Sequence, residues 1–165
     1  MTLVDTLLPE FDHEMATTRK LLERVPEDQV DWKPHAKSWT LGQLAQHVAT
    51  LPMWGSITLN QSELDLSAGG ETPTLRTRDD LLAAFDRHVA DTRGALAGRT
   101  DAELMAPWTL KNGGQVVFSM PKAAMWRSFV LNHLVHHRGQ LSVYLRLQDI
   151  PVPSIYGPSA DEGQL

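Results

Sequence analysis

The chain has 165 residues, of which 42% are hydrophobic and 21% are charged, and its formal net charge at pH 7 is −5. This length fits a single domain, residues 1–165, with enough chain to bury a hydrophobic core. Acidic residues outnumber basic ones, 20 to 15, whereas nucleic-acid binding relies on Lys and Arg to neutralise phosphates. The composition therefore argues against a nucleic-acid partner.

The sequence contains no cysteine, which excludes disulfides and thiolate metal ligands. No apolar run approaches the roughly 20 residues that a membrane-spanning helix needs, so we expect no membrane partner. Asp5, Pro9, Glu10 and Asp12 interrupt the N-terminal segment, so it lacks the apolar block of an export signal. These features predict a cytoplasmic protein.

Apolar residues recur at helical spacing in the first part of the chain and predict an amphipathic helix over residues 3–24. Residues 26–39 contain two prolines and predict a loop. We expect the large aromatic side chains of Trp32 and Trp39 in this loop to pack onto the core.

A second helix is predicted to begin at the hydroxyl residues that flank Trp39, since either can cap its first turn. His47 lies on the apolar stripe of this helix, and Pro52 predicts a kink or an early end near Leu51. Residues 60–76 are mostly polar and predict a long surface connection, of the kind that can cover a site.

A third helix is predicted from Thr77 to about Gly98, because a hydroxyl cap precedes acidic residues and an apolar stripe. The same capping pattern at Thr100 predicts a short helical turn. Residues 108–118 alternate around Gly113-Gly114 and predict a β-hairpin.

The last helix is predicted from Pro121 to about Gln148. Leu131 and Val135 lie opposite its histidine-bearing face, and this second apolar face predicts self-association. The turn-rich tail from Val152 onward is expected to dock on the domain. These elements predict an all-α fold, a four-helix bundle with a small β-hairpin before the last helix.

Three of the seven histidines lie close together in the last helix, at His133, His136 and His137. His133 and His137 are four residues apart, so they lie one turn apart on one helix face and can share a metal ion. His136 is rotated by about 100° from His137 and is predicted not to coordinate. Such a pair needs a third ligand, and His47 in the second helix is the candidate.

Three neutral imidazoles leave a coordination position open for water or substrate, as in catalytic metal centres. The pattern differs from that of zincin metalloproteases, because Leu134 stands where their general base, Glu, follows the first histidine. A histidine cluster that is satisfied in the core without metal stays open as an alternative. Gln140 and Tyr144 lie on the same face, and they could contact a ligand, orient a histidine or only pack.

The chain resembles the DinB-like superfamily, which includes bacillithiol transferases and mycothiol-dependent maleylpyruvate isomerases. The resemblance rests on three stretches, Trp39–Val48, Asn132–Leu141 and Val152–Asp161, and on the order and spacing of the predicted helices. It implies an up-up-down-down four-helix bundle that is usually a homodimer.

The resemblance also implies one divalent metal ion, bound by His47, His133 and His137. Zinc or nickel is expected, and iron or manganese also occurs in such sites. The function implied is a thiol-dependent S-transferase, or a related transferase or hydrolase, with a small-molecule substrate. The alternative is a non-catalytic dimeric protein that binds a metal or a small ligand, because the histidine motif contains no general base.

Overall fold

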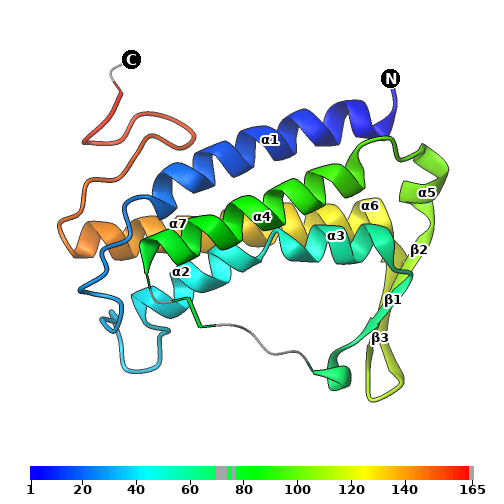
Figure 1. The fold of residues 1–165 in the computed structure, drawn as a ribbon, viewed down its shortest axis with the longest axis horizontal. Helices are drawn as coiled ribbons and strands as arrows, with labels where there is room; N and C mark the ends of the chain where they lie inside the picture. Colours follow the sequence, from blue (N-terminus) through cyan, green and yellow to red (C-terminus); the bar gives the residue numbers. More distant parts are fainter. Residues whose placement is uncertain (70–73, 76, 164–165) are drawn as a thin grey trace.

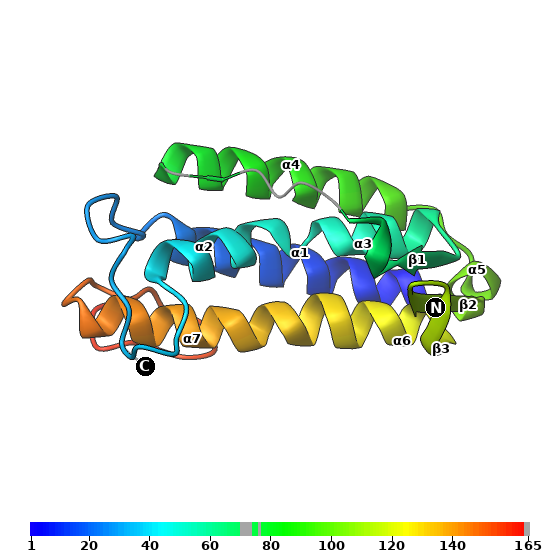
Figure 2. The ribbon, with the colours of Figure 1, turned by 90° about the horizontal axis from the view of Figure 1, so that it is seen from below.

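The structure is a computed structural model, and it describes residues 1–69, 74–75 and 77–163. The chain is mostly helical, with a small three-stranded sheet at one end of the long helices (Figure 1). The loop over residues 23–40 and the C-terminal tail lie at the opposite end (Figure 2). Among the helices described, none is long and apolar enough to cross a membrane.

Helix α1, Leu3–Leu22, confirms the first predicted helix. Its start is fixed by a capping box: the Thr2 hydroxyl accepts a hydrogen bond from the Asp5 amide, and the Asp5 carboxylate accepts one from the Thr2 amide. Phe11 lies on its inner face and packs against Trp126, with ring centroids 5.3 Å apart. The helix is therefore anchored both by its cap and by an aromatic contact in the core.

The second predicted helix is divided at Pro52 into α2, Leu41–Thr50, and α3, Met53–Asn60, as its proline predicts. Thr92 on a neighbouring helix stabilises this break. Its buried hydroxyl donates to the Pro52 carbonyl over 2.6 Å and accepts from the Ser56 amide over 3.0 Å. Thr92 thus gives the Ser56 amide a partner inside the core and adds a second donor to the Pro52 carbonyl, which also accepts from the Gly55 amide.

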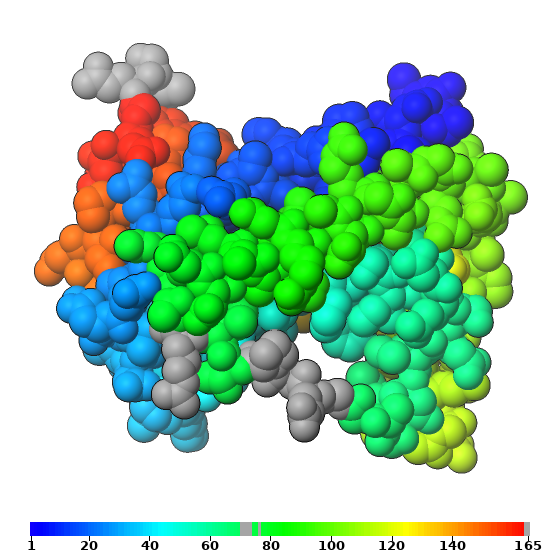
Figure 3. All heavy atoms as spheres, viewed as in Figure 1, coloured from blue at the N-terminus to red at the C-terminus, as the bar shows by residue number. Residues whose placement is uncertain are grey.

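Two further predicted helical segments are confirmed: α4, Arg78–Leu96, capped by Thr77, and the short α5, Asp101–Met105, capped by Thr100. Helix α4 packs against α1, α2 and α3. In the space-filling view, its side chains form a ridge across the front of the molecule (Figure 3).

The predicted hairpin is confirmed as β2, Pro107–Asn112, and β3, Gln115–Pro121, which pair antiparallel. A third strand, β1, Glu63–Asp65, pairs parallel to β2 and is followed by a 3₁₀ turn, Leu66–Ala68. The surface connection predicted over residues 60–76 therefore contains a strand and a 3₁₀ turn near its start, which its composition does not predict. Residues 70–73 and 76 of that connection lie outside the described residues.

The Asp65 carboxylate joins the new strand to the hairpin. It accepts hydrogen bonds from Ser67 and from the amides of Gly113 and Gly114 in the hairpin turn. Both glycines have positive φ angles, 59° and 76°, as a tight hairpin turn requires. These bonds, the Ser67 hydroxyl first among them, lower the pKa of Asp65 to about 2.

The last predicted helix is one continuous rod in space, but its hydrogen bonding is not uniform (Figure 2). It consists of α6, Lys122–Met125, a π-helix, Trp126–Asn132, and α7, His133–Leu147. The prediction of a single α-helix from Pro121 is therefore wrong in its middle. Together with the break at Pro52, this gives more helical segments than the four predicted.

The predicted outer apolar face of this rod is also wrong. Leu131 is 2% exposed and belongs to the core, and Val135 is partly buried. The exposed apolar side chains of the rod are instead Phe129, Val143 and Leu147.

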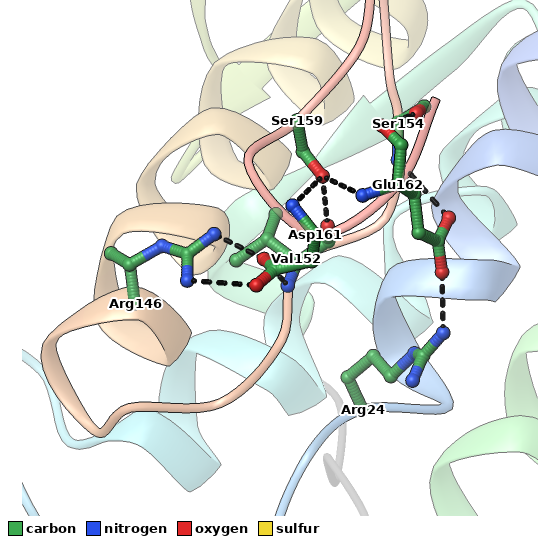
Figure 4. A network of polar contacts seen from close by, with 7 residues as sticks. All are labelled: Arg24, Arg146, Val152, Ser154, Ser159, Asp161 and Glu162. Carbon is green, nitrogen blue, oxygen red and sulfur yellow. Dashed lines mark hydrogen bonds and ion pairs between the residues drawn. The ribbon is translucent and has the colours of Figure 1, made fainter. Parts of the chain in front are cut away.

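The tail docks on the ends of α1 and α7, as predicted for its described part (Figure 4). Arg146 pairs with Asp161, and Arg24 pairs with Glu162 over 2.6 Å. Ser159 closes the tail on itself: its hydroxyl donates to the Val152 carbonyl and accepts from the amides at positions 161 and 162.

A buried ion pair connects α1 and α7 beside the tail. The guanidinium of Arg138, 1% exposed, lies 2.6 Å from the carboxylate of Glu14, and it also bonds to the Thr18 hydroxyl. Tyr156 in the tail donates to the same carboxylate over 2.8 Å, and its ring lies 5.0 Å from the guanidinium carbon. Three segments of the chain therefore meet at one charged pair.

Gly55 lies where α3 approaches α4 closely. A Cβ atom there would overlap with Thr92 and lie 3.0 Å from Trp126. We predict that Gly55→Ala lowers the free energy of unfolding by about 1–3 kcal/mol through overpacking, more than the roughly 1 kcal/mol that Ala contributes as a helix former. Urea denaturation measures this change.

The matched control is Gly94→Ala in α4, where a Cβ atom meets nothing within 4 Å. We expect this variant to be as stable as the parent or up to about 1 kcal/mol more stable. Equal stability of the two variants would show that the close approach at Gly55 is not tight.

Candidate metal centre

The start of α2 fixes the position of His47. The Thr40 hydroxyl accepts from the Gln43 amide over 3.1 Å, and the Gln43 side chain accepts from the Thr40 amide over 2.9 Å. This capping box sets where the helix begins, and His47 lies seven residues after Thr40, on nearly the same face. Helix α2 packs against α7, so this face brings the imidazole toward the histidines of α7.

The structure brings together the three predicted ligands, His47, His133 and His137. Their nearest ligand atoms all lie within 4.8 Å of one another, and all three side chains are partly buried. Ring centroids are 4.5 Å apart for His47 and His137, 4.7 Å for His133 and His137, and 5.1 Å for His47 and His133.

The distances suit a divalent ion. The Nε2 atoms of His47 and His133 are 3.3 Å apart. Two nitrogens that bind one tetrahedral zinc ion at 2.0–2.1 Å are separated by about 3.3 Å. A hydrogen bond between these two rings could explain this pair alone, but it leaves the third ring, His137, converging on the same point without a partner there. The donor set therefore fits a metal ion better than a histidine pair.

The rings are held in the neutral form that a metal requires. Burial, together with repulsion from His137 and His133, lowers the pKa of His47 to about 4. Burial also lowers the pKa values of His133 and His137. At neutral pH each ring therefore has a free lone pair, and no proton has to leave before a metal binds.

Gln140 orients one of the ligands. The Nδ1 atom of His137 lies 2.7 Å from the Gln140 side-chain oxygen. Since an amide oxygen only accepts, Nδ1 carries the proton and Nε2 is left free for a metal. Of the roles that the sequence leaves open for Gln140, this geometry selects the orientation of a histidine.

His136 and Tyr144 lie outside the ligand set. His136 is exposed, although its ring is 4.8 Å from that of His137. Tyr144 packs edge-on against Trp32, and its hydroxyl lies 3.4 Å from the Trp39 carbonyl. Tyr144 therefore supports the loop that precedes α2.

Trp39 is a site residue for which the sequence gives a different expectation. It is predicted to pack onto the core, yet it is 47% exposed and lies against the cluster. Its ring stacks on His137 at 5.6 Å and meets His47 edge-on at 5.0 Å. Trp39 precedes α2 in an irregular loop, so no helical periodicity could have revealed this contact.

A cavity of about 470 Å³ opens beside the cluster. His47 and Trp39 form part of its wall, and Gln43, Gln46 and Thr50 line it along one face of α2. Leu75 closes another side, and its amide donates to the Gln46 side chain over 2.9 Å. Leu75 belongs to the surface connection predicted over residues 60–76, so the described end of that connection borders the site.

Comparison with known proteins identifies the family. The sequence matches the DinB superfamily over residues 10–141. It is 30% identical over 166 residues to uncharacterized protein YrdA of Bacillus subtilis strain 168, and the alignment covers 96% of this chain and 91% of that protein. The chain belongs to the DinB superfamily.

Two solved structures share the fold. A DinB-like protein from Bacillus cereus ATCC 10987 superposes with a TM-score of 0.71 at 23% identity, over 94% of this chain and 98% of that one. The DinB-like protein YjoA from Bacillus subtilis has a TM-score of 0.67 at 20% identity, over 88% and 95% of the two chains. The resemblance inferred from three sequence stretches is thus confirmed for the family, and the mostly helical fold is shared with DinB-like proteins, whereas the count of four helices is not confirmed.

Substitution of each histidine tests the ligand set. We predict that His47→Ala, His133→Ala and His137→Ala each weaken metal binding by more than about 100-fold. Loss of a metal ligand should lower the affinity more than loss of a residue that only hydrogen-bonds to a ligand, which typically costs about 10- to 100-fold. Metal content after exchange into metal-free buffer measures this. His136→Ala is the matched control and should retain one ion per chain. Stoichiometric metal in either His47→Ala or His137→Ala would refute the three-histidine assignment.

Proposed function

We propose that this protein is a divalent-metal-dependent enzyme that transfers a low-molecular-weight thiol to an electrophile. One observation carries the proposal: three neutral imidazoles from α2 and α7 converge beside a cavity large enough for a small molecule. A divalent ion held there, zinc or nickel first and iron or manganese next, would supply a Lewis acid that lowers the pKa of a thiol at the open position.

The proposed reaction is a substitution at carbon. The thiol proton passes to solvent, the sulfur forms a bond to the electrophilic carbon, and the leaving group departs with its electron pair. The chain's own contribution is positional: Gln140 holds the His137 ring in place, and Trp39 shields one side of that ring from water.

The cavity would hold the part of the substrate that does not bind the metal. Gln43, Gln46 and Thr50 offer amide and hydroxyl groups along α2, and Trp39 offers an apolar surface next to His47. A ligand in this cavity therefore meets polar groups on one wall and His47, one of the three candidate metal ligands, beside them, as expected of a substrate site.

A second candidate is a non-catalytic protein that binds a metal or a small ligand. It is favoured by Leu134, which stands where a general base would follow His133, and by a ligand set that contains no carboxylate among the described residues. In this alternative the ion stabilises the contact between α2 and α7.

The proposal includes a cytoplasmic homodimer. The exposed apolar side chains of Phe129, Val143 and Leu147 on the last helical rod are available for self-association. Sedimentation velocity measures the oligomeric state, and a monomer at all accessible concentrations would remove this part of the proposal.

A conjugation assay tests the function. We expect zinc- or nickel-loaded protein to accelerate the reaction of at least one of cysteine, glutathione, coenzyme A or bacillithiol with a haloalkyl electrophile such as monochlorobimane. His133→Ala should lower kcat/KM roughly 100-fold or more, since the metal's Lewis acidity would be lost. Trp39→Ala should retain metal and raise KM, because it removes a cavity wall.

His136→Ala serves as the control and should keep the full rate, since its ring is exposed and outside the ligand set. Metal-loaded protein that gives only the background rate with every thiol would favour the non-catalytic alternative.

A further inference from the structure

The loop that precedes α2 is bound to the first turn of that helix. The Leu41 amide donates to the Trp32 carbonyl over 2.8 Å, and the Gly42 amide donates to the Val30 carbonyl over the same distance. Gly42 permits this approach, because a Cβ atom there would lie 3.0 Å from the Val30 Cβ atom. Asp31 lies between the two tethered residues, so its backbone has a fixed position beside the start of α2.

Asp31 also lines the cavity that opens beside the candidate metal centre. Its side chain is exposed, and no hydrogen bond or ion pair joins it to another of the described residues. Burial, first among the causes, lowers the pKa of His47 to about 4, so this ring is neutral at pH 7. Asp31 therefore carries the only charge among the described residues of the cavity lining.

The backbone at this end of the cavity is not available to bind an anion. The start of a helix usually presents free amides, which attract carboxylates and phosphates. In α2 the amides of Leu41 and Gly42 already donate to the loop, and the Gln43 amide donates to the Thr40 hydroxyl. The first three amides of the helix thus have acceptors, and an anion placed here would meet only the negative charge of Asp31.

An aromatic side chain in the same lining also favours a cation. Trp39 is 47% exposed and forms part of the cavity wall next to His47. The face of an indole ring attracts ammonium groups and offers no such attraction to a carboxylate. The described charge and the described aromatic surface of the cavity therefore agree in sign.

The distances suit a small substrate. Asp31 is tethered at the level of Gly42, and His47 lies five residues further along α2, which corresponds to about 7.5 Å of helix. A sulfur atom bound to the ion would lie about 2.3 Å from it. A group that is a few bonds from this sulfur then falls between the level of His47 and that of Asp31.

We propose that the thiol substrate carries an ammonium group a few bonds from its sulfur, and that the Asp31 carboxylate recognises this group. The inference rests on the proposed thiol-transfer function and names the class of thiol. Asp31 is then a specificity-determining residue outside the three-histidine ligand set. Its carboxylate attracts an ammonium group and repels a carboxylate at the same position, so one residue both selects and rejects.

Three thiols of similar size and different charge test the inference: cysteamine, which is cationic, 2-mercaptoethanol, which is neutral, and 3-mercaptopropionate, which is anionic. Their dissociation constants from nickel-loaded protein are measured by the thiolate-to-nickel charge-transfer band, which does not require catalysis. We expect Asp31→Asn to weaken cysteamine binding about two- to fivefold, as for an exposed ion pair. The variant should strengthen 3-mercaptopropionate binding by a similar factor and leave 2-mercaptoethanol binding unchanged.

The matched control is Asp28→Asn, which removes the same charge from an exposed position of the same loop outside the cavity lining. We expect it to leave the affinities of all three thiols unchanged. An equal shift in both variants would overturn the inference, because the overall charge of the protein would then explain it. An Asp31→Asn effect that is the same for all three thiols would also overturn it, since a structural change would be the cause.

Failure of the inference and failure of the proposed function give different results. If no thiol produced the charge-transfer band with the nickel-loaded parent protein, the proposed function would fail and the inference with it. If all three thiols bound and Asp31→Asn left each affinity unchanged, only the role of Asp31 would be refuted.

Discussion

The candidate centre depends on the rotation of α7 about its own axis. Successive helix residues point about 100° apart, so a rotation by one residue would replace His137 with the exposed His136. Arg138 opposes such a rotation because its guanidinium is buried against Glu14 of α1 while the neighbouring His137 faces α2. A buried charge that loses its partner costs about 3–5 kcal/mol, so few rotations of α7 are compatible with this pair. Tyr156 adds the tail to the same contact.

The position of His47 on α2 is fixed by residues that are not metal ligands. The capping box at Thr40 sets where α2 begins, and Thr92 of α4 satisfies backbone groups where α2 gives way to α3. His47 lies between these two fixed ends on a helix of ten residues. The histidines are therefore positioned by polar contacts in three places, and the hydrophobic core between them keeps the helices at packing distance.

The sequence predicts well those features that a short stretch of chain determines. Capping residues located the starts of α2, α4 and α5, Pro52 located a break, and Gly113-Gly114 located a hairpin turn. The His-X3-His spacing together with an upstream helical His identified all three residues that the structure brings together.

The features that it misses depend on tertiary structure. The strand β1 has three residues and exists because β2 lies beside it, so it carries no pattern of its own. The π-helix bonds each amide to the carbonyl five residues earlier instead of four, which changes the faces that its residues occupy. Trp39 lies in a loop, and its contact with His137 arises only when the loop folds back over α7. Regular α-helical spacing through this segment places Leu131 on an outer face, whereas in the structure Leu131 is 2% exposed and belongs to the core.

The central claim is that His47, His133 and His137 bind one ion and leave a position open. X-ray absorption spectroscopy at the zinc K-edge, on protein loaded with one equivalent of zinc, tests it most directly. The account predicts three imidazole nitrogens at about 2.0 Å and one further light atom that an added thiol replaces with sulfur at about 2.3 Å. A spectrum with two or fewer imidazoles, or one that is closed by four protein ligands and does not respond to thiol, would contradict it.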